Sequence, residues 1–139
     1  MTGRPTWMDF AWPELGVKET PGPGSNPRVL EYHAATNLHA SDDAVAWCSA
    51  FVNWCMQRAS ITGTNSAAAR SWLGWGVRTQ EAYGAIAVLE RGPNPTLGHV
   101  GLLIHRAAGR IWLLGGNQGD AVSVASFDVA RLIDLRWPA

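Results

Sequence analysis

The sequence has little of what marks a nucleic-acid-binding, membrane or metal-binding protein. Of its 139 residues, 11 are Lys or Arg and 11 are Asp or Glu, so the formal net charge is zero. A basic nucleic-acid-binding surface is therefore not expected. No apolar run reaches the length of about 18 residues that a membrane span needs. The absence of CxxC and HExxH motifs argues against a zinc site, which is built from closely spaced Cys and His pairs.

The N-terminus also lacks the continuous apolar segment of a cleaved signal peptide. It reads "MTGRPTWMDFAWPELG", with polar and apolar residues mixed. We therefore expect synthesis in the cytoplasm without a signal peptide. Any target outside the cytoplasm would have to be reached by another route.

The composition is that of a folded chain. Hydrophobic residues make up 47% and charged residues 16%, which excludes a disordered protein. A chain of this length fits one core, so residues 1–139 are predicted to form a single domain. Eight tryptophans are spread over the whole sequence. Indole rings fill cores, and they also line grooves that bind sugars or peptides.

The hydrophobic period changes along the chain from helical to two-residue. The N-terminal part, about 5–76, contains predicted helical segments, the strongest of them over 46–60. The C-terminal part, about 84–138, alternates as strands do and has turn residues at hairpin spacing. Helices followed by strands predict an α+β fold with an antiparallel sheet of about four to six strands. The predicted strands lie within 84–92, 99–107, 110–117, 120–128 and 132–138.

The only two cysteines, Cys48 and Cys55, lie seven positions apart on the strongest predicted helix. Seven helical residues rise about 10.5 Å, whereas a disulfide needs Cα atoms within about 7 Å, so a bond between them is excluded. Cys55 lies on the apolar stripe and is predicted to be buried and inert. Cys48 lies where the helix begins, and there unpaired N–H groups and the helix dipole lower a thiol's pKa. It is a candidate nucleophile, although a small core residue fits the same position.

A thiolate nucleophile also needs a base and a group that orients the base. His99 opens a predicted strand after a Gly- and Pro-rich loop and is the candidate base. His105, at the other end of that strand, is predicted to be exposed to solvent. Asn117 ends the next strand, and a hairpin centred near residue 108 places it beside His99. Asn117 is therefore the candidate orienting residue.

Five stretches in this order resemble the NlpC/P60 and CHAP superfamily: "WCSAFVNWC", "SWLGWG", "GAIAVLERG", "GHVGLLI" and "GGNQGD". These are papain-like cysteine hydrolases of bacterial cell walls, and the sequence is similar to a compact subgroup found in phage lysins. The resemblance implies an α+β papain-like core in which the cysteine helix packs on a small antiparallel sheet. It implies Cys48 as the nucleophile, His99 as the general base and acid, and Asn117 as the orienting residue. It implies no cofactor and no metal.

Two positions depart from the pattern of the superfamily. Trp47 stands where many NlpC/P60 enzymes have an Asp that binds a free amino group, and Gly115 stands where many CHAP enzymes have an acid. An acidic partner could instead be Asp43 or Asp120. The predicted groove walls, which would bind substrate, are the loop at 21–27, Trp47, Trp75 and Gln118.

The function expected from this resemblance is hydrolysis of an amide bond in the peptidoglycan stem peptide. The chain would be an endopeptidase or an N-acetylmuramoyl-L-alanine amidase, acting as a monomer on bacterial peptidoglycan. It would serve as a phage-type endolysin released by a holin, or as an exported bacteriolytic effector with a dedicated immunity protein. Two alternatives stay open: a non-catalytic, Trp-rich glycan-binding module, and a cysteine amidase acting on another substrate.

Overall fold

The computed structural model describes residues 5–20, 24–37 and 46–139 and shows helices followed by strands. This order and the antiparallel pairing confirm the predicted α+β class. The helical elements are α1 (Met8–Ala11), η1 (Trp12–Glu14), α2 (Pro27–Ala34), α3 (Cys48–Arg58), η2 (Ala69–Gly74) and η3 (Val129–Arg131). The strands are β1 (Val77–Arg78), β2 (Ile86–Glu90), β3 (Gly98–Ala107), β4 (Arg110–Gly115), β5 (Ser123–Asp128) and β6 (Leu132–Trp137).

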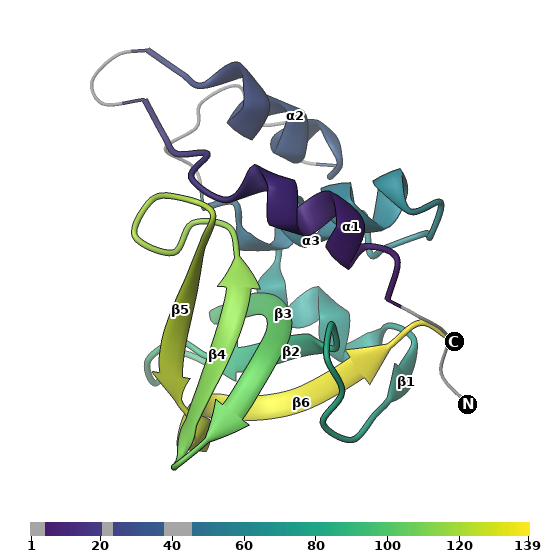
Figure 1. Cartoon of the computed structure of the whole chain (residues 1–139), viewed down its shortest axis with the longest axis vertical. Helices are drawn as coiled ribbons and strands as arrows, with labels where there is room; N and C mark the ends of the chain where they lie inside the picture. Colours follow the sequence, from purple (N-terminus) through teal and green to yellow (C-terminus); the bar gives the residue numbers. More distant parts are fainter. Residues whose placement is uncertain (1–4, 21–23, 38–45) are drawn as a thin grey trace.

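The six strands form one sheet in the order β1-β6-β2-β3-β4-β5, and every neighbouring pair is antiparallel (Figure 1). The β3–β4 hairpin turns at Ala108 and Gly109, whose φ angles are 53° and 77°. Leu102 pairs with Leu114, as a hairpin centred near residue 108 requires. A bulge between Leu103 and His105 shifts the register by one residue toward the turn. The predicted hairpin register is therefore confirmed in the half of the strands that lies farther from the turn.

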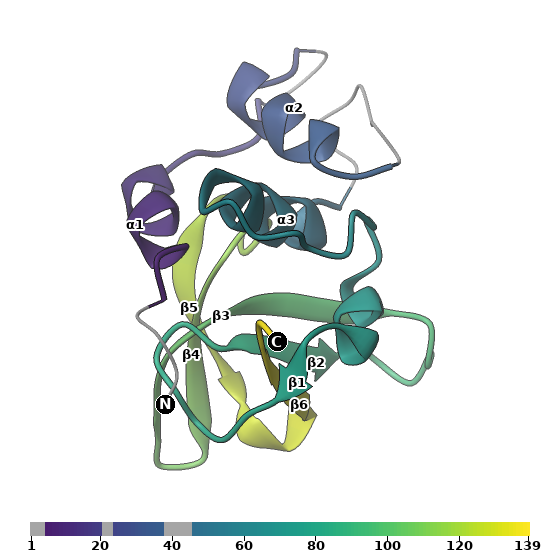
Figure 2. The same cartoon turned by 90° about the vertical axis from the view of Figure 1, so that its right-hand side faces the viewer.

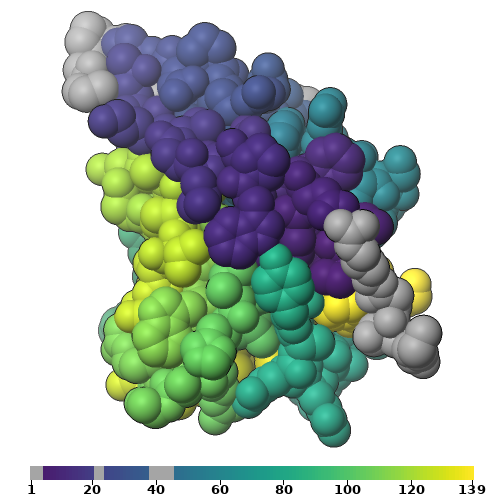
Figure 3. Space-filling model, in the orientation of Figure 1, coloured from purple at the N-terminus to yellow at the C-terminus, as the bar shows by residue number. Residues whose placement is uncertain are grey.

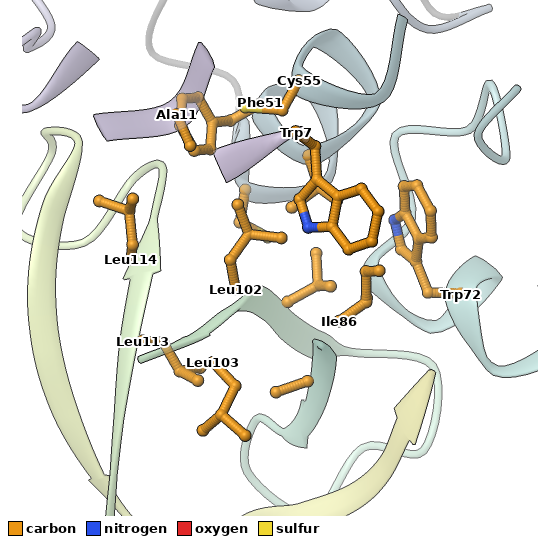
Figure 4. Close-up of a cluster of buried hydrophobic side chains, with 14 of the residues drawn as sticks. Trp7, Ala11, Phe51, Cys55, Trp72, Ile86, Leu102, Leu103, Leu113 and Leu114 are labelled. Carbon is orange, nitrogen blue, oxygen red and sulfur yellow. The ribbon is translucent and has the colours of Figure 1, made fainter. Parts of the chain in front are cut away.

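Helix α3 lies between α2 and the sheet (Figure 2). The apolar face of α3 packs on β3 and β4, and Phe51 and Cys55 contribute to one core with Leu102 and Leu114 (Figure 4). The expected apolar stripe of this helix is therefore inside the molecule. Because α3 rests on β3, its first residue lies close to the beginning of that strand.

A buried polar network fixes the first turns of α3. Ser49 Oγ donates to the carbonyl of Ser66 at 2.7 Å and accepts from Trp72 Nε1 at 2.9 Å. One turn later, the side chain of Asn53 accepts from the backbone N–H of Asn65 at 2.9 Å. These bonds satisfy groups that would be costly to bury unpaired, and they tie the start of α3 to the segment that leads into η2.

The helix boundaries show where local patterns predict well and where they do not. Asn26 caps α2 by accepting from the N–H of Arg28, as expected for a cap that precedes Pro27. Within the N-terminal part predicted to contain helical segments, residues 66–76 form only the short 3₁₀ helix η2. The strand β1 was not predicted, because two exposed residues carry no alternation that could reveal it.

The N-terminal segment packs directly against the rest of the molecule (Figure 3). Trp7 donates from Nε1 to the carbonyl of Gly84 at 2.8 Å and packs edge-on against Trp137 at 5.1 Å. The buried carboxylate of Glu14 accepts from the hydroxyl of Tyr32 at 2.6 Å and pairs with Arg28 at 3.1 Å. This segment therefore belongs to the hydrophobic core.

Among the described residues, no helix has the length and hydropathy needed to cross a membrane.

Candidate active site

Cys48 is the first residue of α3, and only 7% of it is exposed. No side chain caps this helix, since Trp47 at the N-cap makes no side-chain cap bond. Burial raises the pKa of the Cys48 thiol. Hydrogen bonding from the backbone N–H groups of Val100 and Ser49 and the charge of Arg91 oppose this rise without cancelling it. The expectation that the helix start lowers this pKa is wrong, because desolvation outweighs the helix N–H groups.

His99 is the second residue of β3 and is half-buried beside the ring of Phe127, with 5.2 Å between ring centroids. Its Nε2 lies 2.9 Å from Oε1 of Gln118. Burial lowers the pKa of His99; the hydrogen bond with Gln118 opposes this, and the charges of Arg131 and Arg91 add to it. The imidazole is therefore held mainly in its neutral form at pH 7.

Both the nitrogen and the oxygen of the Gln118 side-chain amide form hydrogen bonds within the protein. Its Nε2 donates to the carbonyls of Leu113 at 3.1 Å and Ser123 at 2.8 Å. Because both donors are used in this way, Oε1 must face His99 and accept from it. The neutral ring then carries its proton on Nε2, and Nδ1 is the ring nitrogen left to accept a proton.

Asn117 was expected to orient His99, but the residue that hydrogen bonds the imidazole is Gln118. Strand β4 ends at Gly115, and the chain then turns through Asn117, whose φ is 58°. This turn brings the side chain of Gln118 within hydrogen-bond distance of the His99 imidazole. A Cβ at Gly115 would lie 2.5 Å from Oε1 of Gln118, so the glycine leaves the space that this amide occupies. Gln118, expected to bind substrate, uses its amide inside the protein instead.

One pocket of about 460 Å³ contains the three predicted catalytic residues. Helix α3 contributes Cys48, β3 contributes His99, and the turn after β4 contributes Asn117. The complete lining is Cys48, Arg91, His99, Asn117, Gln118, Gly119, Ala125, Phe127 and Arg131. The arrangement brings a thiol, a neutral imidazole and a fixed amide to one concave surface, as nucleophilic catalysis requires.

A family model described as CHAP domain matches residues 40–117, and this span holds all three predicted catalytic residues. The chain belongs to the CHAP domain family. No curated protein matches it.

Among solved structures, the chain is similar to a protein of the NLP/P60 family from Staphylococcus aureus subsp. aureus Mu50, described as similar to lipoprotein. The match has a TM-score of 0.53 at 18% identity and covers 96% of this chain. It covers 41% of the other chain, so the sequence spans about two-fifths of that protein. The likeness supports the papain-like α+β fold that the NlpC/P60–CHAP superfamily shares.

Two tryptophans predicted as walls of the CHAP-domain pocket lie elsewhere. Trp47 is fully buried, stacked on Tyr32 at 5.6 Å, and donates from Nε1 to Glu19 at 2.7 Å. Trp75 packs edge-on against Trp72 at 4.9 Å, and neither of these residues lines the pocket. Both predictions are corrected, because these rings fill space within the fold.

The remaining candidates are placed as follows. Asp43 and residues 21–23 lie outside the described residues, and residues 24–27 do not line the pocket. Asp120 lines a neighbouring hollow with Lys18 and Glu19 and makes no contact with His99 among the interactions described. His105 is exposed, as expected. Among the described residues, no group of three or more His, Cys, Asp or Glu side chains could hold a metal ion.

Sequence reasoning missed the wall formed by Arg91, Phe127 and Arg131. Arg91 follows β2, Phe127 lies on β5, and Arg131 ends η3. No motif or spacing links these three positions. Contacts between elements far apart in the sequence bring them into the pocket: Phe127 packs on His99, and Arg131 donates to the carbonyl of Glu90 at the end of β2.

Proposed function

We propose that the chain hydrolyses an amide bond of the peptidoglycan stem peptide by a cysteine–histidine mechanism. The observation that carries the proposal is the pocket that Cys48 and His99 share, with the imidazole tied to the fixed amide of Gln118. Membership of the CHAP family, a family of peptidoglycan hydrolases, supports the substrate class.

In the proposed reaction, Nδ1 of His99 takes the proton of the Cys48 thiol as the sulfur attacks the carbonyl carbon. The backbone N–H of Cys48, at the start of α3, donates to the oxyanion of the tetrahedral intermediate. The C–N bond then breaks, and His99 returns its proton to the leaving amine. Water, deprotonated by His99, cleaves the thioester and releases the carboxylic acid and the free thiol.

The directions of the two pKa shifts indicate how the reaction begins. A raised pKa keeps Cys48 as a thiol at pH 7, and a lowered pKa keeps His99 neutral. The resting pair is then uncharged, and the proton moves as the substrate binds and the sulfur attacks. Gln118 serves as the positioning residue, because it holds the tautomer in which Nδ1 accepts the proton.

Product analysis tests the proposal. Purified peptidoglycan is digested with the protein and with Cys48→Ala, and the released fragments are identified by mass spectrometry. A new amino terminus within the stem indicates an endopeptidase, whereas an intact stem freed from muramic acid indicates an N-acetylmuramoyl-L-alanine amidase. No fragment from the unmodified protein, or equal release by Cys48→Ala, contradicts the proposal.

The biological setting that fits this activity is the cell wall outside the cytoplasmic membrane. A phage-type endolysin reaches it after holin release, and a bacteriolytic effector reaches it by export. An effector would need an immunity protein that covers the pocket. Protection of cells by a co-expressed neighbouring gene product distinguishes the effector from the lysin.

The Trp-rich glycan-binding module is less well supported. Four of the eight tryptophans, Trp7, Trp47, Trp72 and Trp137, are buried, and none of the eight lines the pocket. The alternative of a cysteine amidase with another substrate uses the same catalytic groups. The digestion described above separates the two activities, because such an amidase releases no wall fragments.

A further inference from the structure

Among the described residues, the charged side chains that line the pocket are all of one sign. They are Arg91 and Arg131, and no described Asp or Glu lines it. The positive charges act on the catalytic groups, since both arginines lower the pKa of His99 and Arg91 lowers that of Cys48. A pocket with this charge favours an anionic group of the substrate next to the reacting atoms.

Arg131 is held by two hydrogen bonds and one ring contact. Its Nε and Nη2 donate to the carbonyl of Glu90 at 3.1 and 2.9 Å, and its guanidinium lies over the ring of Phe127 at 5.2 Å. A guanidinium has five N–H donors, so these two bonds leave the Nη1 group and one Nη2 hydrogen for another acceptor. The ring of His99 also packs on Phe127, and all three residues line the pocket.

Arg91 reaches the same place from another element. It directly follows Glu90, whose carbonyl Arg131 binds, so the two arginines converge at the end of β2. Arg91 is exposed, and neither arginine forms an ion pair with a carboxylate of the described residues. Two guanidinium groups that have no carboxylate partner in the described part of the chain thus border the pocket that contains Cys48.

We propose that Arg91 and Arg131 form a carboxylate-binding subsite next to the nucleophile, which selects substrates with a free carboxylate near the scissile amide. The inference rests on the proposed function and adds a specificity to it. Guanidinium groups bind carboxylates through paired, charge-assisted hydrogen bonds. Stem peptides carry carboxyl groups that are free in some cell walls and amidated in others. The subsite therefore directs the enzyme to unamidated stems.

The test compares two muropeptides that differ only in whether the carboxyl groups of the second and third stem residues are free or amidated. The unmodified protein is expected to show a kcat/KM at least about tenfold higher for the free acid. Arg91→Gln and Arg131→Gln should each lower kcat/KM for the free acid about tenfold more than kcat/KM for the amidated substrate. Equal rates on both substrates, or an equal loss on both, would overturn the subsite.

Matched variants separate this role from a structural one. Arg110→Gln removes a guanidinium at the other end of β4, where it binds Ser126, and should change neither rate. Arg131→Lys keeps the charge and should retain part of the preference that Arg131→Gln loses. If Arg131→Lys and Arg131→Gln slow both substrates equally, Arg131 acts through packing and the subsite is wrong.

Calorimetry of muropeptide binding to the Cys48→Ala variant tests the subsite separately from hydrolysis. If Cys48→Ala binds the free acid more tightly than the amidated muropeptide, and adding Arg91→Gln abolishes this difference, the subsite is supported. This holds even if the unmodified protein cuts neither muropeptide. Cleavage of both muropeptides at equal rates supports the hydrolase and refutes the subsite. The preference should also weaken as salt is added, because the Arg91 side chain is open to solvent.

Discussion

The two cysteines of α3 are close in burial and different in surroundings. Cys48 is 7% exposed and Cys55 is 0% exposed, and burial raises the pKa of both thiols. Cys48 borders a pocket with an imidazole and two arginines. Cys55 lies about two turns further along α3, in the core near Phe51, where the charge of Glu14 raises its pKa further (Figure 4).

The two thiols differ in the charges and dipoles around the sulfur far more than in solvent exposure. At Cys48, the N–H groups of Val100 and Ser49 and the charge of Arg91 all favour the thiolate. At Cys55, the interior offers no comparable cation, and an acid lies nearby. Because such charges and dipoles control the reactivity of a thiol, they favour Cys48 over Cys55 as the candidate nucleophile.

The largest expected effect comes from removing each sulfur in turn. Cys48→Ala should lower hydrolysis of purified peptidoglycan by more than about 10³-fold, because the nucleophile is lost. Cys55→Ala should keep the activity and lower the free energy of unfolding by about 1–2 kcal/mol, because it leaves a small cavity in the core. Turbidity loss of wall suspensions and thermal unfolding measure the two quantities. Loss of activity in a folded Cys55→Ala protein would reverse the assignment.

The helix on which this comparison rests was predictable from the sequence. The apolar stripe of 46–60 and the polar stretch before it located its beginning near Cys48, and the two-residue period after residue 84 predicted the strands. Both signals are local. The 3₁₀ form of η2 and the short strand β1 depend on tertiary packing and carry no such signal.

The sequence predicted part of the candidate site. The hairpin centre near residue 108 brought His99 to the end of β4, and the register at Leu102 and Leu114 confirms it. The choice between Asn117 and Gln118 depended on a turn after the strand, where alternation no longer applies. Arg131 could not be found, because it reaches the pocket through the packing of η3 on β2.

The second prediction concerns the group that orients His99. Gln118→Ala should lower kcat by about 100-fold, since the imidazole loses the bond that holds its tautomer, whereas KM should change little. Asn117→Ala is the matched control in the neighbouring position and should retain most of the activity. Steady-state kinetics on a soluble muropeptide measure both.

A structural role alone for Gln118 predicts a different pattern. The amide also binds the carbonyls of Leu113 and Ser123, so Gln118→Ala should also lower the melting temperature. If activity returns fully at a temperature where the variant is folded, the orienting role is wrong. If Asn117→Ala shows the larger loss in kcat, the original expectation for Asn117 is restored.

The third prediction sharpens the contrast between the cysteines by their reactivity. Iodoacetamide should modify Cys48 in the folded protein at least about tenfold faster than Cys55, because only Cys48 borders the pocket. The raised pKa means that the thiolate fraction increases as pH rises past the usual range of a thiol. The rate at Cys48 should therefore still be rising at about pH 9. Peptide mass spectrometry measures each site, and equal labelling would contradict the comparison.

The smallest expected effect is on the titration of His99. Burial and the charges of Arg131 and Arg91 lower its pKa, so the acidic limb of kcat/KM should lie below the value of about 6.5 for a free imidazole. Arg91→Gln removes one of those charges from the exposed rim, so the pKa of His99 should rise. Proton NMR of the imidazole in Cys48→Ala, with and without Arg91→Gln, measures the shift free of the thiol. A downward shift would mean that Arg91 does not act on His99 through its charge, and that its guanidinium lies too far from the catalytic groups to guide a carboxylate toward them.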